Sequence, residues 1–163
     1  SKQFIRSPAE WRPIPGSLEA IARLNQAGYH VVVATNQSGL GRGLFDMDTL
    51  NGIHEKMHRT VLGVGGRIDA IFYCPHTVES DCLCRKPKSG MFERIAKCFN
   101  IDLPGTPAVG DSLRDLQAAA AVGATPLLVL TGKGTQTKDE GGLPEGTLIF
   151  PDLAAAADHI LSL

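Results

Sequence analysis

Apolar stretches rich in β-branched residues alternate along this chain with segments whose apolar residues recur at helical spacing. The apolar stretches are residues 29–35, 68–73, 107–109 and 127–130. Their length and composition predict short buried strands. Helices are predicted between them, at residues 17–28, 46–57, 89–99 and 113–122. Strands that alternate with helices pair in parallel through right-handed crossovers, so the pattern predicts an α/β fold with a doubly wound parallel sheet.

Several predicted helices have suitable capping residues at their ends. Ser17 and Asp46 can each accept a hydrogen bond at a helix start, and Gly28 suits a helix end. Cys98 falls inside the predicted helix 89–99, where we expect a core thiol. The glycine-containing residues 132–146 are predicted to form the longest polar loop.

The composition is typical of one globular domain with a substantial core. Of the 163 residues, 43% are hydrophobic and 20% are charged, so we expect a single domain over residues 1–163. The formal net charge is -1, whereas a protein that binds nucleic acid normally has a basic excess. We therefore expect no nucleic-acid partner.

No apolar stretch is long enough to span a bilayer, and the opening residues lack the apolar core of a signal peptide. We therefore expect a cytoplasmic protein without a membrane partner. Thiols in that compartment stay reduced.

Three cysteines and one histidine are concentrated in residues 74–84. They are Cys74, His76, Cys82 and Cys84. Thiolates and a neutral imidazole nitrogen are the ligands that zinc prefers. Ordinary buried thiols or disulfides are the alternatives, but the close spacing favours zinc. Four protein ligands leave no position for a catalytic water, so the zinc would be structural.

Polar residues also follow the first predicted strand, and folds of this class place their chemistry beyond the carboxyl ends of the strands. Thr35, Asn36, Gln37 and Ser38 precede Gly39. Their hydroxyl, amide and backbone N–H groups can hold phosphate oxygens. A plain turn explains the same residues equally well.

Charged residues follow the cysteine cluster and the third strand. Arg85 and Lys86 precede Pro87, and a fixed lysine suits a phosphate, although such a pair can also serve solubility. Asp111, with Asp115 one helical turn later, suits Mg2+. An aspartate at this place can instead be a helix N-cap.

These residues resemble motifs of the haloacid dehalogenase superfamily of phosphohydrolases: Thr35 its second motif, Lys86 its third, and Asp111 with Asp115 its fourth. Residues 35–45, 74–87 and 130–134 are similar to a small branch of that superfamily with a zinc loop. The resemblance covers nearly the whole chain. It implies a Rossmann-type sheet without a large cap domain.

The resemblance implies a Mg2+-dependent phosphatase that forms an aspartyl phosphate. Thr35 and Lys86 would stabilise the transferring phosphoryl group, and Asp111 with Ser112 would hold Mg2+. Arg85 would recognise the distal part of a small phosphorylated sugar. Asp115 and Arg42 would support the site. The other implied substrate-binding residues are Ser1, Lys2, Gln3, Phe4, Asn36, Gln37 and Ser38.

The sequence departs from the superfamily in one respect. The first strand of the superfamily ends in Asp-x-Asp, which supplies the nucleophile and the general acid and base, and these 163 residues contain no such motif. Residues 1–4 resemble the loop that follows that strand. We therefore expect the nucleophile to lie upstream of Ser1 and the 163 residues alone to be inactive.

Three alternatives to a sugar phosphatase remain open. A histidinol-phosphate phosphatase shares the zinc loop, but Ser38 and Arg42 suit a second phosphate better than an imidazole or an amine. A polynucleotide 3'-phosphatase resembles residues 41–43 and 85–90, but it lacks the metal loop. A non-catalytic zinc-ordered binding module would explain the missing nucleophile. We expect the protein to be a monomer.

Overall fold

The structure is a computed structural model that describes residues 14–36, 46–76 and 82–163. The chain divides into two compact units, residues 1–82 and residues 83–163. Among the helices described, none combines the length and the apolar character needed to cross a membrane. That residues 1–163 act as one functional domain stays a prediction.

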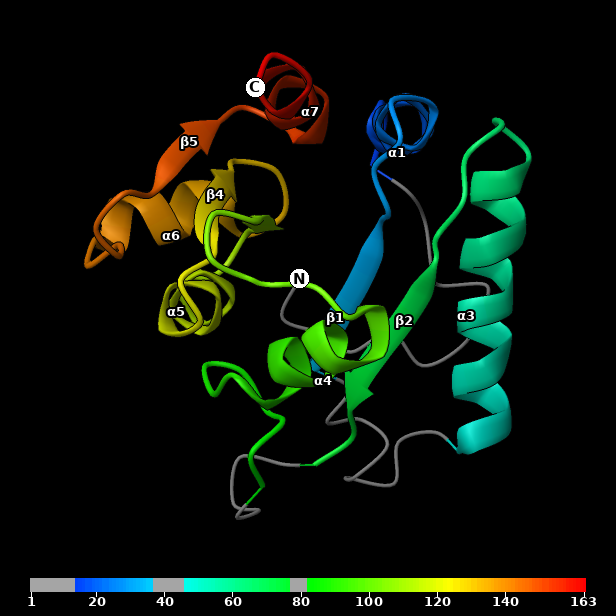
Figure 1. Ribbon diagram of the computed structural model, residues 1–163, viewed down its shortest axis with the longest axis horizontal. Coiled ribbons are helices and arrows are strands. Elements are labelled where there is room, and N and C mark those ends of the chain that lie inside the picture. Colours follow the sequence, from blue (N-terminus) through cyan, green and yellow to red (C-terminus); the bar gives the residue numbers. More distant parts are fainter. Residues whose placement is uncertain (1–13, 37–45, 77–81) are drawn as a thin grey trace. The chain divides into compact units, whose positions relative to one another are not determined.

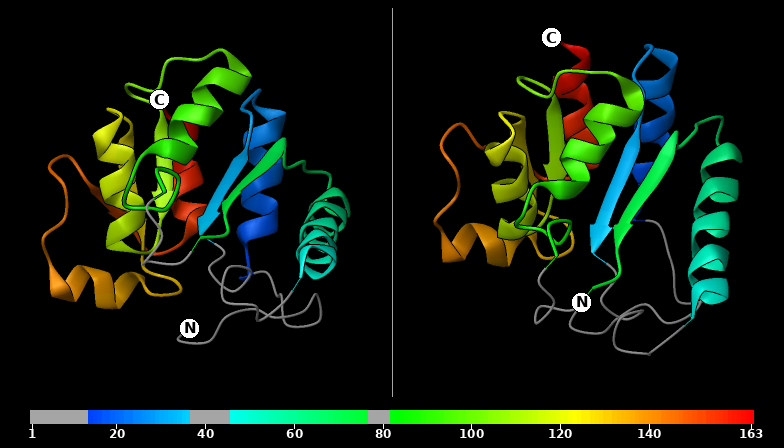
Figure 2. Two further views of the ribbon diagram at one scale, coloured as in Figure 1. Left: turned by 90° about the horizontal axis from the view of Figure 1, so that it is seen from below. Right: turned by 60° about the horizontal axis from the view of Figure 1, so that its bottom comes forward.

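The described part of the first unit contains two helices and two strands. They are α1 (Ser17–Gln26), β1 (Val32–Asn36), α3 (Met47–Leu62) and β2 (Ala70–Cys74). The strands pair in parallel, with Thr35 opposite Tyr73 and Asn36 opposite Cys74. α3 runs alongside β2 (Figures 1 and 2). The carboxyl ends of β1 and β2 therefore lie at the same edge of this sheet.

Capping determines where the two helices of this unit begin. As predicted, Asp46 caps α3, because its Oδ1 accepts a hydrogen bond from the Thr49 N–H at 2.8 Å. The prediction that Ser17 caps α1 was wrong, since Ser17 is already helical and the N-cap is Gly16. Gly16 has a φ of 85°, a left-handed conformation that glycine adopts without steric cost. Gly28, with a φ of 94°, follows the end of α1 as predicted.

One carboxylate connects the starts of β1 and β2. Asp69 Oδ2 accepts a hydrogen bond from the Val31 N–H at 2.8 Å, and Arg67 Nε lies 2.8 Å from Asp69 Oδ1. Burial opposes ionisation of this carboxyl group, but the bonds from Val31, His30 and Arg67 outweigh burial and lower the pKa of Asp69. Asp69 therefore links the starts of the two strands, at the end of the sheet opposite to Thr35 and Asn36.

The second unit alternates helices with strands. Its elements are α4 (Gly90–Phe99), β3 (Pro107–Gly110), α5 (Leu113–Ala121), β4 (Thr125–Val129), α6 (Gly134–Glu140), β5 (Leu148–Phe150) and α7 (Leu153–Leu161). The three strands form a parallel sheet in the order β3-β4-β5. α5 and α7 cover opposite sides of this sheet (Figure 1). The core includes Leu116 of α5, Leu127 and Leu128 of β4, and Ala156 and Ala157 of α7.

The predicted α/β fold with parallel strands is confirmed, but the described strands are not all buried and do not form a single sheet. The described strands form two parallel sheets, β1-β2 and β3-β4-β5, and no described strand belongs to both. Only β4 is buried over nearly its whole length, whereas β1 is half-buried throughout. β4 is also the only described strand with a neighbour on each side.

Two predictions about single segments were wrong. Residues 132–146 contain the helix α6, which was not foreseen because residues 134–140 carry no apolar stripe at helical spacing. Local bonds such as Gln136 Nε2 to Glu140 Oε1, 3.0 Å, support α6 instead. Cys98 is exposed rather than in the core, because it lies in the last turn of α4, beyond the buried Met91 and Ile95.

Candidate functional site

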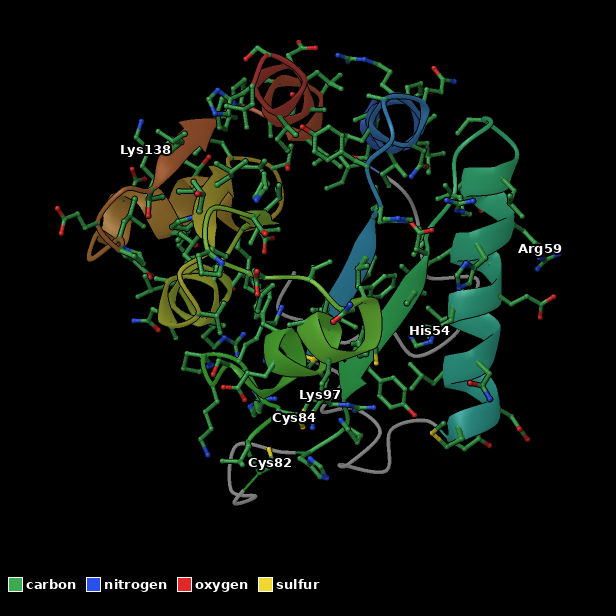
Figure 3. The ribbon with its side chains drawn as sticks, viewed as in Figure 1. His54, Arg59, Cys82, Cys84, Lys97 and Lys138 are labelled. Carbon is green, nitrogen blue, oxygen red and sulfur yellow. The ribbon has the colours of Figure 1, made fainter. Side chains whose placement is uncertain are left out.

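The four predicted zinc ligands lie together, beginning with the last residue of β2. The potential ligand atoms of Cys74, His76, Cys82 and Cys84 all lie within 4.8 Å of one another. Cys74 is fully buried as the last residue of β2, and Figure 3 labels Cys82 and Cys84. None of the three cysteines is joined in a disulfide. The cluster could therefore hold a metal ion.

Two distances inside this cluster match the edges of a zinc tetrahedron. Bonds of about 2.3 Å to sulfur and about 2.1 Å to nitrogen give tetrahedral edges of about 3.8 Å between sulfurs and about 3.6 Å between sulfur and nitrogen. Cys74 Sγ lies 3.7 Å from Cys82 Sγ and 3.5 Å from His76 Nδ1. The donor set and its spacing thus both suit zinc.

A tight turn at residues 83–90 positions Lys86. The Lys88 N–H donates to the Arg85 carbonyl at 2.9 Å, and the Gly90 N–H donates to the Leu83 carbonyl at 3.0 Å. A Cβ at Gly90 would lie 2.3 Å from the Leu83 carbonyl oxygen, so only glycine permits this closure. The turn presents Lys86 immediately after the cysteine cluster.

Lys86 forms an ion pair with Asp115 of α5. Lys86 Nζ donates to Asp115 Oδ1, and the two side chains are only 12% and 18% exposed. The other carboxylate oxygen, Oδ2, accepts hydrogen bonds from the Asp111 and Ser112 N–H groups, both at 3.2 Å. Asp115 therefore connects the lysine to the turn between β3 and α5.

The same turn begins α5. Ser112 is the N-cap, and its Oγ accepts a hydrogen bond from the Asp115 N–H at 3.4 Å, which completes a capping box. A Cβ at Gly110 would lie 2.3 Å from Asp115 Cβ, so Asp115 can approach the turn only because residue 110 is glycine. Burial opposes ionisation of Asp115, but Lys86 and the Ser112 hydrogen bonds outweigh it and lower the pKa of Asp115.

Asp111 lies directly after β3 and is held from α6. Its Oδ2 accepts a hydrogen bond from the Lys133 N–H at 3.0 Å, and its carbonyl oxygen accepts one from Thr137 Oγ1 at 2.7 Å. Asp111 is not the helix N-cap, since Ser112 has that position. Its carboxylate therefore stands at the strand tip, where the motif reading expected a cation ligand.

The other predicted site residues are described within the unit to which each belongs. Thr35 and Asn36 are the last residues of β1 in the first unit, and Thr35 Oγ1 donates to the Asn36 carbonyl at 3.3 Å. Arg85 is half-buried within the turn 83–90. The remaining predicted residues, Ser1, Lys2, Gln3, Phe4, Gln37, Ser38 and Arg42, lie outside the described residues.

Sequence reasoning did not identify the residues of α6 that hold Asp111. The donors are a backbone N–H at Lys133 and a hydroxyl at Thr137. A backbone donor leaves no trace in residue type, and a threonine in a polar segment is usually solvated. The segment 130–134 was noted for its resemblance alone, without a structural role.

The sequence matches two families of known proteins. Residues 83–156 match a family described as HAD-hydrolase-like, and residues 1–113 match a family described as polynucleotide kinase 3 phosphatase. Together the two matches relate nearly the whole chain to HAD-like hydrolases or to a phosphatase family.

Individual relatives are similar to this chain over nearly its whole length. The D-glycero-beta-D-manno-heptose-1,7-bisphosphate 7-phosphatase of Bordetella bronchiseptica is 60% identical over 99% of this chain and 90% of that protein. The enzyme of the same name from Pseudomonas aeruginosa is 51% identical over 99% of this chain and 90% of its own. These relatives do not support the expectation that the 163 residues are inactive.

Two crystal structures extend the likeness to the fold. The D,D-heptose 1,7-bisphosphate phosphatase of B. bronchiseptica, complexed with magnesium and phosphate, is 59% identical, with a TM-score of 0.97 over 99% of this chain and 90% of its own. The enzyme from Burkholderia thailandensis is 58% identical, with a TM-score of 0.80 over 98% of this chain and 92% of its own. The chain therefore belongs to the HAD-like phosphatases and, within them, to the D-glycero-beta-D-manno-heptose-1,7-bisphosphate 7-phosphatase family.

Proposed function

We propose that this protein is a Mg2+-dependent phosphatase that removes the 7-phosphate of D-glycero-D-manno-heptose 1,7-bisphosphate. The single observation that carries this proposal is the 60% identity to an enzyme of that name over 99% of the chain. The cluster of Lys86, Asp115 and Asp111 supports it, because it combines a fixed cation with a strand-tip carboxylate.

In this proposal the groups of the second unit neutralise and orient the transferring phosphoryl group. Lys86 contributes a positive charge, which the ion pair with Asp115 holds in place. Asp111 would hold Mg2+ with Ser112, and the ion would supply further charge neutralisation. Carboxylate oxygens are preferred Mg2+ ligands, so the residues fit this ion. Phosphoryl transfer depends mainly on such positioning and electrostatics.

Other residues would serve substrate recognition. Asn36 would contact the substrate, together with the predicted substrate-binding residues outside the described ranges, whereas Thr35 would help Lys86 to stabilise the transferring phosphoryl group. Arg85 would bind the part of the substrate that does not react, because a planar guanidinium suits a phosphate or vicinal hydroxyls. We further propose the covalent aspartyl-phosphate route expected from the superfamily.

We also propose that the cluster of Cys74, His76, Cys82 and Cys84 holds a structural zinc ion. Its support is the donor set within 4.8 Å and the match of two edges to a zinc tetrahedron. With four protein ligands, the ion would order residues 74–84 and the approach to Lys86 rather than activate water.

This activity would supply a monophosphorylated heptose for glycan precursors such as those of ADP-heptose, the lipopolysaccharide core or an S-layer glycan. A cytoplasmic monomer with a small sugar phosphate as its substrate fits this role. Size-exclusion chromatography with light scattering would test the monomeric state.

The test uses the protein expressed from its complete reading frame. Phosphate release is measured from both anomers of the heptose bisphosphate, from histidinol phosphate and from an oligonucleotide with a 3'-phosphate, with and without Mg2+. We expect the highest kcat/KM on a heptose bisphosphate, and loss of that turnover without Mg2+. Higher kcat/KM on either competitor would refute the proposed substrate.

The polynucleotide 3'-phosphatase is the second candidate, because residues 1–113 match that family. The formal net charge of -1 speaks against it, since binding to a phosphate backbone normally requires a basic surface. The oligonucleotide in the experiment above decides between the two.

A further inference from the structure

Thr137 is the only buried polar residue among those the structure describes, with an exposure of 6%. Its Oγ1 lies 2.7 Å from the Asp111 carbonyl oxygen and 3.1 Å from the Lys133 carbonyl oxygen. One hydroxyl proton is thus shared between the turn after β3 and the start of α6. Loss of this hydroxyl would leave the Asp111 carbonyl without this donor, which is costly because the hydroxyl is buried.

The backbone that precedes α6 acts on the side chain of Asp111. The Lys133 N–H donates to Asp111 Oδ2 at 3.0 Å. A Cβ at Gly132 would lie 2.3 Å from the same oxygen, and Gly132 has a φ of 58°, so two constraints require glycine there. Within the described part of the chain, no hydrogen bond is found to Asp111 Oδ1. The carboxylate is therefore held by one oxygen, and the other is left for a ligand.

We propose that Thr137 is a positioning residue for Asp111, and that the bracket formed by Gly132, Lys133 and Thr137 orients Asp111 so that Oδ1 can bind the catalytic cation. This inference rests on the proposed function. Thr137 holds the main chain of Asp111, while the Lys133 N–H holds its carboxylate. Both contacts depend on the start of α6, because Thr137 also binds the Lys133 carbonyl. Hydrogen bonds from outer residues orient the ligands of metal sites in this way.

The test compares Thr137→Val, which keeps the shape and removes the hydroxyl, with Thr137→Ser, which retains it. Thr135→Val is the matched control, because Thr135 Oγ1 donates to the Leu130 carbonyl at 3.3 Å from the same helix but is exposed. Isothermal titration with Mg2+ alone measures affinity in the protein expressed from its complete reading frame. The Mg2+ dependence of phosphate release is measured in parallel.

We expect Thr137→Val to weaken Mg2+ binding about 10-fold or more and to raise the half-saturating Mg2+ concentration of the reaction by the same factor. Thr137→Ser and Thr135→Val should remain within about twofold of the wild type, on the same grounds. Saturating Mg2+ should restore much of the turnover of Thr137→Val, because Thr137 itself does not touch the substrate.

Unchanged Mg2+ affinity in a folded Thr137→Val protein would overturn the inference, even if its melting temperature fell, because Thr137 would then have only a structural role. Should Thr137→Val not fold, Thr137→Ala is compared with Thr137→Ser, and equal Mg2+ affinities there overturn the inference as well. A wild-type protein that binds Mg2+ but does not hydrolyse the heptose bisphosphate would refute the proposed function instead.

Discussion

At the residue scale, the two carboxylate oxygens of Asp115 have different partners. One oxygen pairs with Lys86, and the other accepts the N–H groups of Asp111 and Ser112. The motif reading treated Asp115 as a second carboxylate near Mg2+. Its hydrogen bonds instead favour a role as the partner that holds Lys86 against the turn after β3.

Replacing Lys86 with methionine should destabilise the fold in a pH-dependent way. The lysine lowers the pKa of Asp115, so its contribution is fully present above the usual aspartate pKa, about 3.9, and is lost as the pH falls through the lowered value. We expect a loss of about 2 kcal/mol at pH 7, the usual range for a hydrogen bond to a charged group, and this loss should shrink toward pH 3. Urea unfolding at a series of pH values measures this difference.

Lys138→Met is the control for that experiment, because Lys138 is an exposed lysine on α6 (Figure 3). It should change the stability by less than about 0.5 kcal/mol at every pH. If the cost of Lys86→Met were the same at pH 7 and pH 3, the proposed coupling to Asp115 would be wrong.

His54 is a second residue whose environment sets a pH response. It points from α3 toward β2, whereas Arg59 on the same helix points away (Figure 3). Its Nε2 is buried without a hydrogen-bond partner among the described residues, and its ring centroid lies 5.7 Å from that of Tyr73. Burial and the neighbouring His58 lower the pKa of His54.

His54→Phe should therefore make the protein less sensitive to mild acid. In the wild type the unfolded chain binds the proton more readily, so stability falls as the pH drops below the usual histidine pKa, about 6.5. The variant lacks this loss, so its free energy of unfolding relative to the wild type should increase as the pH falls from 7 to 5. His58→Gln should give an intermediate response. A constant difference over this range would contradict the prediction.

At the element scale, the segment from β2 to α4 depends on the cysteine cluster and on the turn 83–90. Cys74 is the last residue of β2, and Gly90 is the first of α4. If zinc binds as proposed, its binding energy is folding energy for this segment.

Cys82→Ser should consequently lose the zinc and lower the melting temperature. Cys98→Ser is the matched control, since Cys98 is an exposed thiol outside the cluster. Metal analysis should find one zinc per chain in the wild type and in Cys98→Ser, and much less in Cys82→Ser. Equal zinc contents in the two variants would rule out this site.

Some elements could be predicted from the sequence because their residues repeat at the period of the element. α3 has its apolar residues at helical spacing after the cap Asp46, and β4 is a continuous apolar run. Likewise, the Cys/His cluster could be predicted because its ligands are close in sequence. The role of α6 could not be predicted, because it depends on one buried hydroxyl, at Thr137, and on one backbone N–H, at Lys133. Neither has a periodic or compositional signature.

At the scale of the whole molecule, the proposed activity requires separate residues to bind the reacting phosphate and the distal part of the substrate. Lys86 is fixed by Asp115, which suits a group that serves the reacting phosphate in every substrate. Arg85 is adjacent in sequence but belongs to the turn itself, since its carbonyl accepts the Lys88 N–H. Its guanidinium suits the distal part of a bisphosphate.

Arg85→Ala should therefore change substrate preference, whereas Lys86→Ala should lower turnover generally. In the protein expressed from its complete reading frame, Arg85→Ala should reduce kcat/KM for the heptose bisphosphate about 10-fold more than for an aryl phosphate, because only the former offers a distal group to bind. Lys86→Ala should reduce both to a similar extent. Parallel steady-state kinetics on the two substrates provide the measurement. Equal losses on both substrates in Arg85→Ala would show that Arg85 acts on the reacting phosphate, and the distal binding site would then have to be assigned to other residues.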